Sequence, residues 1–381
     1  MRSEAEIIER IRKWLPSRAQ DRPWLRLGVG DDAAVLLAGS YAASGKEADR
    51  PDWVLSCDQF LEDVHFLGGI HPPEIIGYKA LARATSDLAA MGAAPRFFML
   101  SLALPASRTG KWLDGFLKGI ALAARKFEMV VIGGDTSRFP KVAVNLTVGG
   151  QAIPRRTRSG SRHSDGVLTR AGARRGDSIY VTGRLGAAQI GLELVLRGLV
   201  RKTRNGLTPL DPDWRPFLET HLRPKIHLAL GRWLAGENTW RIQIASAAID
   251  ISDGLSTDLG HICRASGVGT RIWANKVPTV PFDEKLRCIG LDPMKLALHG
   301  GEDYQLLFTV PARTTHYLPK TNRGVKITKI GEIVDLTGPS LQKLGKPQSE
   351  SSRKSRIELI DEDGSSSLLM SHGWDPFRTR R

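Results

Sequence analysis

The sequence contains few cysteines and no long apolar run. Only three of its 381 residues are Cys, and the spacing of Cys57, Cys263 and Cys288 matches no familiar disulfide framework. This scarcity fits a reducing compartment, so we expect a cytoplasmic protein. The N-terminal stretch MRSEAEIIERIRKWLP is charged throughout and lacks the apolar core of a signal peptide. The longest apolar run, FFMLSLALPA, is too short to span a bilayer, so we expect no membrane contact.

Aromatic residues are nearly absent from the basic stretches of the chain. Lys and Arg total 55 against 40 Asp and Glu, a formal net charge of +15. Such an excess suits either nucleic acid or anionic small substrates. Arg is dense in 155–175 and 197–204, but these stretches lack the stacking aromatics of single-strand binding surfaces. We therefore expect a solvated basic surface, and keep a basic nucleic-acid-binding protein as the alternative of another class.

The remaining sequence has the length and patterning of two domains. A capping box of Ser3 and Glu6 predicts a first helix. The basic segment 154–165 interrupts the pattern of strands and helices, and we expect it to link an N-terminal domain (1–153) to a C-terminal domain (166–381). Loops or insertions are expected at 39–52, 154–166, 200–216 and 335–356. The patterns predict strands at 53–57, 96–104, 129–134, 141–150, 178–182 and 304–310, and helices near 73–91, 109–127, 186–198, 225–235 and 255–266.

Carboxylates recur where predicted strands end in small residues. One carboxylate, Asp87 in ATSDLAAMG, instead lies on a predicted helix, close to an apolar stripe. Carboxylates at strand ends and glycine turns suit magnesium, which takes hard oxygen ligands and bridges carboxylates to substrate phosphates. The pattern therefore indicates metal-dependent phosphoryl transfer. The strand-end carboxylates are Asp31, Asp32, Asp58, Asp135, Asp250, Asp253, Glu302 and Asp303.

Most of these carboxylates also have a simpler structural interpretation. Asp253 would cap the helix that follows it, and Asp258 would be a solvated partner of that helix dipole. Asp135 would be an ordinary turn residue, and Asp87 would pair with Arg83 one helical turn away, worth about 0.3 kcal/mol. Asp250 has no such interpretation, because its neighbours on both sides are apolar and an unpaired buried charge is costly.

Six motifs, taken together and in this order, carry a resemblance to a known family: GVGDDAAVL, SDLAAMGA, IGGDTSR, LTRAGARRGD, AIDISDGLSTDLGHI and GGEDYQLLFTV. The chain resembles the thiamine-monophosphate kinases, within the wider family of aminoimidazole-ribonucleotide-synthetase-like ATP enzymes. The resemblance implies an α+β fold of two domains, an N-terminal mixed α/β domain with a dimer-forming sheet and a C-terminal α/β domain. It also implies a homodimer with ATP and metals near the domain junction, where residues 1–153 bind ATP and metal and residues 166–381 complete the nucleotide and substrate site.

The resemblance implies direct, magnesium-assisted, in-line transfer of the ATP γ-phosphate onto thiamine monophosphate, with several Mg²⁺ ions, ATP as co-substrate and no covalent nucleophile. The sister synthetases of the same fold, which make selenophosphate or aminoimidazole ribonucleotide, are the nearest alternative. Cys57 stands where the family usually has Thr, and a thiol is a poor magnesium ligand. By similarity the metal ligands are Asp32, Ser56, Cys57, Asp58, Asp87, Asp135, Asp250 and Asp253; the ATP contacts are Gly134, Asp135, Arg170 and Ser252; and the substrate contacts are His65, Glu302 and Trp374.

Overall fold

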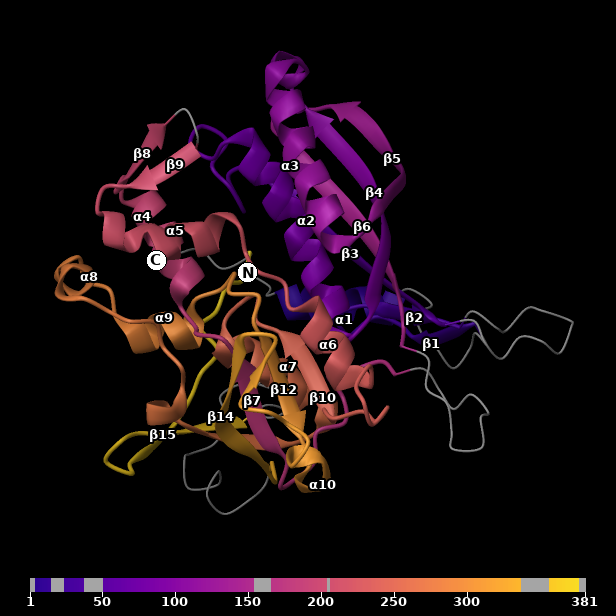
Figure 1. Cartoon of the computed structure of the whole chain (residues 1–381), viewed down its shortest axis with the longest axis vertical. Coiled ribbons are helices and arrows are strands. Elements are labelled where there is room, and N and C mark those ends of the chain that lie inside the picture. The colour runs from indigo at the N-terminus through magenta and orange to yellow at the C-terminus, as the bar shows by residue number, and fades with distance from the viewer. Residues whose placement is uncertain are drawn as a thin grey trace, which may run out of the picture.

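The chain forms two β-sheets with helices packed against both, as a computed structural model shows (Figure 1). This arrangement confirms the predicted α+β architecture. The domain boundaries given above stay a prediction, since the linker 154–165 lies outside the residues that the structure describes. The described residues are 4–14, 24–37, 51–153, 166–203, 206–336 and 356–376.

The first sheet has six strands in the order β1-β2-β3-β6-β4-β5. Neighbouring strands are antiparallel except β4 and β5, which run parallel. Helices α2 and α3 cover one face of this sheet (Figure 1). They approach closely because glycine stands at their contact: a Cβ at Gly77 would lie 2.1 Å from the Phe116 carbonyl oxygen. The elements are α1 (Glu4–Trp14), β1 (Leu25–Leu27), β2 (Ala34–Leu36), β3 (Trp53–Leu61), α2 (Pro73–Ala90), β4 (Ala94–Leu104), α3 (Lys111–Phe127), β5 (Val130–Arg138) and β6 (Ala143–Gln151).

The second sheet follows the order β10-β12-β7-β14-β11-β15-β16, with β13 paired to β14. Its apolar residues face two cores, one under α7 and α9 and the other under α6. A separate hairpin, β8-β9, precedes α5. The elements are β7 (Ser178–Thr182), α4 (Ala187–Leu196), β8 (Val200–Thr203), β9 (Gly206–Pro209), α5 (Arg215–Leu222), α6 (Leu228–Ala235), β10 (Ala247–Asp250), α7 (Leu255–Ser266), β11 (Gly269–Trp273), α8 (Glu284–Cys288), α9 (Pro293–His299), β12 (Leu306–Val310), α10 (Ala312–Thr315), β13 (Thr321–Asn322), β14 (Val325–Val334), β15 (Arg356–Ile360) and β16 (Ser366–Leu368).

Helix α2 lies between the two sheets. It contacts β3, β4 and β6 of the first sheet, β10 of the second sheet, and α6. Its first turn begins with Pro73, whose fixed φ suits that position and whose missing N–H costs nothing there. Toward its end, Ala89 and Ala90 join the apolar core of α6. Side chains of this one helix therefore contact both the first sheet and the edge of the second.

Most of the predicted elements are confirmed, and the prediction for one segment is wrong. The strand predicted at 178–182 and the helix predicted at 255–266 match β7 and α7 residue for residue. The segment 200–216, expected to be a loop, instead forms the β8-β9 hairpin and a short 3-10 helix. Of the other expected loops, residues 39–50 and 337–355 lie outside the described part of the chain.

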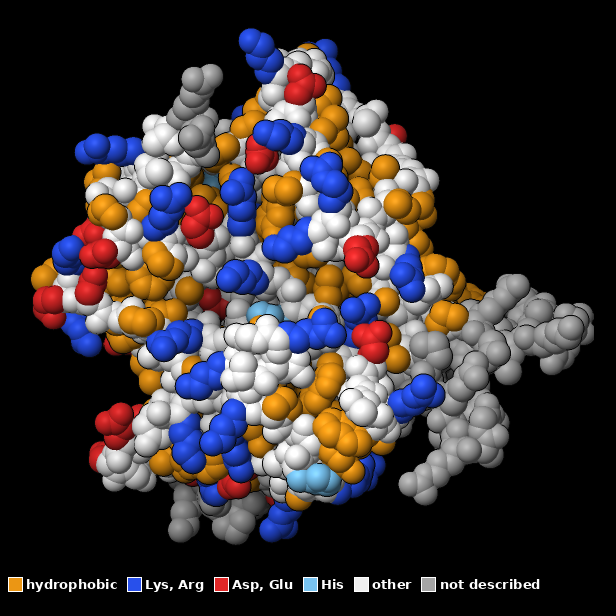
Figure 2. Space-filling model, viewed as in Figure 1, with side chains coloured by type: hydrophobic (Ala, Val, Ile, Leu, Met, Phe, Trp, Pro, Cys, Tyr) orange, Lys and Arg blue, Asp and Glu red, His pale blue; other side chains and the backbone are white. Residues whose placement is uncertain are grey.

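Basic side chains are spread over the molecule. Figure 2 shows Lys and Arg distributed across one face, with Asp, Glu and apolar side chains between them. Among the helices that the structure describes, none has the length and apolar character needed to cross a bilayer.

Candidate active site

Three carboxylates from distant parts of the sequence converge beside α2. Asp32 precedes β2, Asp87 belongs to the last turn of α2, and Asp250 ends β10. One carboxylate oxygen of each lies within 4.8 Å of the other two. Each side chain is buried or partly buried. The structure thus assembles a compact acidic cluster, defined here as Asp32, Asp87 and Asp250, from both sheets and the helix between them.

The alternation of β10 explains why an aspartate stands in an apolar run. Successive side chains of a strand point to opposite faces, so Ile249 enters the core under α7 while Asp250 points the other way. There the Ser86 hydroxyl of α2 donates a hydrogen bond of 2.6 Å to the Asp250 carboxylate. Asp250 is therefore buried but not surrounded by hydrocarbon, and its face of the strand is the one that meets α2.

The same alternation separates Ser56 from Cys57 on β3. Ser56 is buried against α2 and its hydroxyl donates a short hydrogen bond to the Asp87 carboxylate. The Cys57 thiol is exposed on the opposite face, 3.3 Å from the Asn145 side-chain oxygen of β6. Its thiol therefore points away from the acidic cluster, which leaves only the Cys57 backbone to serve a metal there.

Arg170 holds Asp32 in place. Its guanidinium donates to Asp32 Oδ1, through Nε at 3.0 Å and through a shorter contact from the terminal nitrogen. Its backbone N–H donates to both carboxylate oxygens of the neighbouring Asp31, at 3.1 and 3.2 Å. The other oxygen of Asp32, Oδ2, is buried and has no hydrogen-bond partner among the described residues. A buried oxygen without a partner is the kind of group that a cation satisfies.

Electrostatics give the same indication. Burial, reinforced by the neighbouring Asp32 carboxylate, raises the pKa of Asp250 to about 7. Burial and the charges of Asp250 and Asp32 also hold the pKa of Asp87 well above its usual range. Desolvation and like-charge repulsion both disfavour the ionised forms. A divalent cation would relieve both effects, so these residues fit a magnesium site.

Asp58 and Asp253 extend the acidic region. The Asp58 carboxylate accepts a hydrogen bond of 3.3 Å from Arg83, so Arg83 pairs with Asp58 across the helix–sheet interface. The suggested pairing of Arg83 with Asp87 along the helix is not observed among the described residues. The Asp87 carboxylate instead accepts a hydrogen bond from Ser56. Burial and the charge of Glu4 raise the pKa of Asp253 to about 7, although Arg83 and Arg170 oppose this rise.

Asp258 is not the solvated residue that the sequence suggested. It is only 1% exposed, and its Oδ2 accepts the backbone N–H groups of Ser252, Asp253 and Gly254 at 3.0–3.2 Å. The tight loop after β10 is thus folded around one carboxylate oxygen. The sequence shows only that an acidic residue follows the loop by four to six positions. A solvated side chain in the first turn of α7 accounts for that spacing equally well.

Two further segments dock on this loop. The Ser252 carbonyl accepts the N–H of Glu302 at 2.8 Å, and the Asp253 carbonyl accepts the N–H of Trp374 at 3.2 Å. Glu302 has a left-handed φ of 66°, unusual for a residue other than glycine. Ser252, Asp253, Glu302 and Trp374, all expected in the site, are therefore brought together by backbone hydrogen bonds.

His65 and Glu302 mark a second end of the site, one that also contains Lys79. The Glu302 carboxylate accepts from the Lys79 ammonium at 2.8 Å. His65 Nδ1 accepts the Leu61 backbone N–H at 3.0 Å, and burial lowers the pKa of His65 to about 3. His65 is therefore neutral, with its proton on Nε2. Lys79 was missed because a lysine on a helix usually indicates a solvated face.

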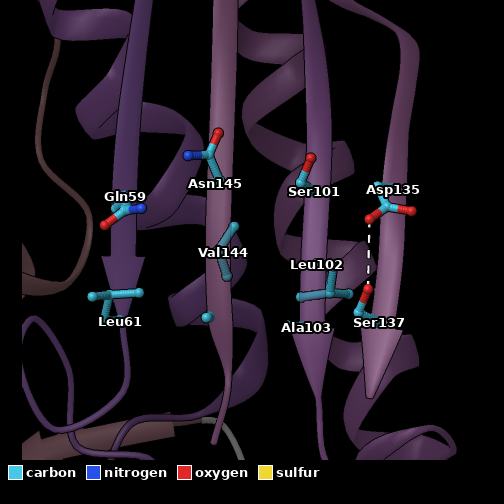
Figure 3. Close-up of a pocket in the computed structure, with 10 residues that line it drawn as sticks. Gln59, Leu61, Ser101, Leu102, Ala103, Asp135, Ser137, Val144 and Asn145 are labelled. Carbon is cyan, nitrogen blue, oxygen red and sulfur yellow. Dashed lines mark hydrogen bonds between the residues drawn. The ribbon is translucent and has the colours of Figure 1, made fainter. Parts of the chain in front are cut away.

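Gly134 and Asp135 stand apart from the acidic cluster. On β5, Asp135 is paired with Ser101 of β4, in a row that continues through Asn145 of β6 and Gln59 of β3. These side chains line a pocket on the face of the first sheet that points away from α2 (Figure 3). Within one chain, Asp135 does not join Asp32, Asp87 and Asp250, so its role as metal and ATP ligand stays a prediction.

The comparisons with known proteins agree with this geometry. Residues 30–154 match the family model described as AIR synthase related protein, N-terminal domain. The thiamine-monophosphate kinase of Salmonella typhimurium is 36% identical over 324 residues, which cover 84% of this chain and 88% of that protein. This chain belongs to the thiamine-monophosphate kinase family.

Solved structures of the family share the fold. A structure described as AaThiL complexed with AMPPCP and TMP covers 99% of this chain and 99% of its own, at 28% identity and a TM-score of 0.72. Thiamine-monophosphate kinase from Stenotrophomonas maltophilia K279a is 34% identical, with a TM-score of 0.63 over 87% of this chain and 94% of that one. The expected family and fold are both confirmed.

Proposed function

We propose that this member of the thiamine-monophosphate kinase family transfers the γ-phosphate of ATP to the phosphate of thiamine monophosphate. The observation that carries the proposal is the convergence of Asp32, Asp87 and Asp250, with one carboxylate oxygen of each within 4.8 Å of the others; Oδ2 of Asp32 is buried and has no partner among the described residues. The relative solved with AMPPCP and TMP, over nearly the whole length of both chains, supports ATP and thiamine monophosphate as the two ligands.

The chain's own residues divide the work. Asp32, Asp87 and Asp250, with Asp58 and Asp253 beside them, would hold magnesium, which neutralises phosphate charge during transfer. Arg170 and the loop of Ser252 orient the nucleotide. Glu302, His65 and Trp374 receive the acceptor. The residues assigned to the site include no Ser–His or Cys–His pair; the nearby Ser256 hydroxyl contacts His299 Nδ1 at 2.9 Å, but Ser256 is fully buried and cannot reach a ligand. We therefore assign direct transfer between the two ligands. Ser56, Cys57, Gly134 and Asp135 complete the expected set of metal and ATP ligands.

The spacing along α2 suits a substrate with a phosphate at one end and a ring at the other. Lys79, Arg83 and Asp87 recur every four residues, so they lie on one side of the helix. At 1.5 Å of rise per residue, Lys79 and Asp87 are about 12 Å apart along the helix axis. This span is comparable to an extended thiamine phosphate, with its phosphate near Asp87 and its aminopyrimidine ring near Glu302.

One assay tests the function. The purified chain is incubated with ATP, magnesium and thiamine monophosphate, and thiamine diphosphate is measured. Turnover that requires magnesium is the expected result. ATP consumption with selenide or with formylglycinamidine ribonucleotide, and none with thiamine monophosphate, would instead support a sister synthetase. Magnesium-independent binding of nucleic acid that falls steeply with salt would support the binding-protein alternative.

The expected homodimer is part of the proposal. β5 is an edge strand of the first sheet, and every one of its residues is exposed. Its apolar residues Val130, Val131 and Ile132 are 57–62% exposed. An exposed apolar edge strand is a common site of pairing with another chain. Light scattering should give twice the 41.8 kDa chain mass. We expect Val131→Asp to yield a monomer and Leu196→Asp, at another exposed apolar position on α4, to leave the dimer intact. A monomeric wild-type chain would contradict the proposal.

Trp374 is expected to bind the thiazolium ring. Its backbone is fixed on the loop of Asp253, and an indole face attracts a permanent cation by about 0.5–2 kcal/mol. Trp374→Ala should therefore raise the KM for thiamine monophosphate roughly 2- to 30-fold, with the KM for ATP little changed. Trp374→Phe, which keeps an aromatic face, is the control and should raise the KM for thiamine monophosphate less. Equal losses for both substrates would indicate a packing role instead.

A further inference from the structure

Four polar side chains form one chain of contacts at the Glu302 end of the site. His71 precedes α2, Lys79 belongs to α2, His221 lies in the last turn of α5 and Glu302 precedes β12. The His71 and His221 rings approach through their Nε2 atoms at 3.3 Å. His221 Nδ1 lies 3.1 Å from Glu302 Oε2, and Lys79 Nζ lies 2.8 Å from the same oxygen. The side chains of Lys79 and His221 are only 3% and 1% exposed, so these contacts are shielded from water.

The hydrogen bonds determine where each imidazole carries its proton. The Leu67 backbone N–H donates to His71 Nδ1 at 3.0 Å, so the His71 proton lies on Nε2. The Leu67 carbonyl oxygen is farther from that nitrogen, at 3.3 Å. Since the two Nε2 atoms face each other, His221 accepts at Nε2 and carries its own proton on Nδ1, which lies nearer to Glu302 Oε2, at 3.1 Å, than to Lys79 Nζ, at 3.3 Å. The His221 Nδ1–H then donates to Glu302, as does the Lys79 ammonium.

Both donors engage the same oxygen of Glu302. Its other oxygen, Oε1, has no hydrogen bond or ion pair with any described residue, and the side chain is 22% exposed. The backbone on which this carboxylate stands is also fixed, because the Glu302 N–H donates to the Ser252 carbonyl at 2.8 Å. One oxygen is thus held by the protein, and the other is left to accept from a ligand.

We propose that His221, Lys79 and His71 are positioning residues that present Glu302 Oε1 to a cationic or N–H-bearing ring of the acceptor substrate. This inference rests on the proposed function, since it assigns a role at the acceptor end of that site. Lys79 supplies the countercharge that keeps the carboxylate ionised, and the two histidines fix the orientation of the Glu302 carboxylate. A protein-held donor pair of this kind lowers the cost of ordering Glu302 when the substrate binds.

Kinetics of matched variants test the role. His221→Leu removes the donor, whereas His221→Asn keeps an N–H near the position of Nδ1. Loss of one hydrogen bond to a charged group should raise the KM for thiamine monophosphate about tenfold or more in His221→Leu, with the KM for ATP changed less than about twofold. His221→Asn should recover most of this loss. His227→Leu is the control, because His227 contacts Gln305 at 2.9 Å and not Glu302; it should leave the KM for thiamine monophosphate near the wild-type value.

Nitrogen-15 spectra of histidine-labelled protein test the geometry without turnover. We expect neutral rings at pH 7, with His221 protonated on Nδ1 and His71 on Nε2. A His221 proton on Nε2, or an unchanged KM for thiamine monophosphate in folded His221→Leu, would overturn the inference. A wild-type chain that binds thiamine monophosphate in calorimetry but never phosphorylates it would refute the proposed function alone; normal wild-type turnover with an unchanged His221→Leu KM would refute the inference alone.

Discussion

Asp87→Asn is expected to lower turnover by roughly 10³-fold or more without weakening the fold. Asp87 is one of three carboxylates that meet within 4.8 Å, and loss of a group that holds metal-bound phosphate removes several kcal/mol of transition-state stabilisation. Burial and the charges of Asp250 and Asp32 raise the pKa of Asp87, so its ionised form is disfavoured in the folded chain. Replacing it by a neutral amide of the same shape removes that cost.

The sign of the stability effect follows from proton linkage. A carboxyl whose pKa is higher in the folded than in the unfolded state loses stability as pH rises from about 4 towards its folded value. Metal-free Asp87→Asn protein should therefore have an equal or higher melting temperature than wild type at pH 8, and the difference should vanish near pH 4. Added magnesium should raise the melting temperature of wild type more than that of the variant. Near-normal turnover in a folded Asp87→Asn protein would contradict the shared metal site.

Asp258→Ala is expected to have the opposite effect on stability. The Asp258 carboxylate oxygen Oδ2 accepts three backbone N–H groups, and each buried donor left without a partner costs about 1–3 kcal/mol. We expect the free energy of unfolding to fall by about 3 kcal/mol or more in urea titrations. Turnover should fall as well, because the loop that carries Ser252 and Asp253 loses its support.

Asp258→Asn separates the hydrogen bonds from the charge. All three donors converge on one oxygen, so the amide oxygen of Asn can accept them in the same geometry. We expect the free energy of unfolding of this variant to lie within about 1 kcal/mol of the wild-type value. If Asn were as destabilising as Ala, the negative charge, and not the hydrogen bonds, would be what folds the loop.

The sequence predicted the elements that carry a strong local signal. The helix over α2 has an unbroken pattern after paired prolines, and the strands β7 and β12 are apolar runs bounded by glycine or proline. Asp87 and Asp250 could be singled out because a charge next to buried positions conflicts with its surroundings, and Asp32 because it stands among small residues at a strand end. Local conflict of this kind is visible without any knowledge of the fold.

Other features depend on contacts between distant segments, so the sequence could not show them. His221 lies 150 residues from His71 and 142 from Lys79, and no local pattern relates them. Asp258 and a solvated helix-cap residue have the same sequence context, and only the fold of the loop distinguishes them. The outward direction of Cys57 and Asp135 likewise follows from strand register, which a motif does not encode.

The position of α2 between the two sheets restricts where this chain can change length. One residue inserted between Lys79 and Asp87 would rotate everything beyond it by about 100° around the helix axis. Asp87 would then leave Asp32 and Asp250, while Lys79 stayed with Glu302, and the two ends of the site would no longer face the same ligand. Insertions and deletions in homologues should therefore avoid α2 and accumulate in connecting segments such as the β8-β9 hairpin, where added residues move no group of the site.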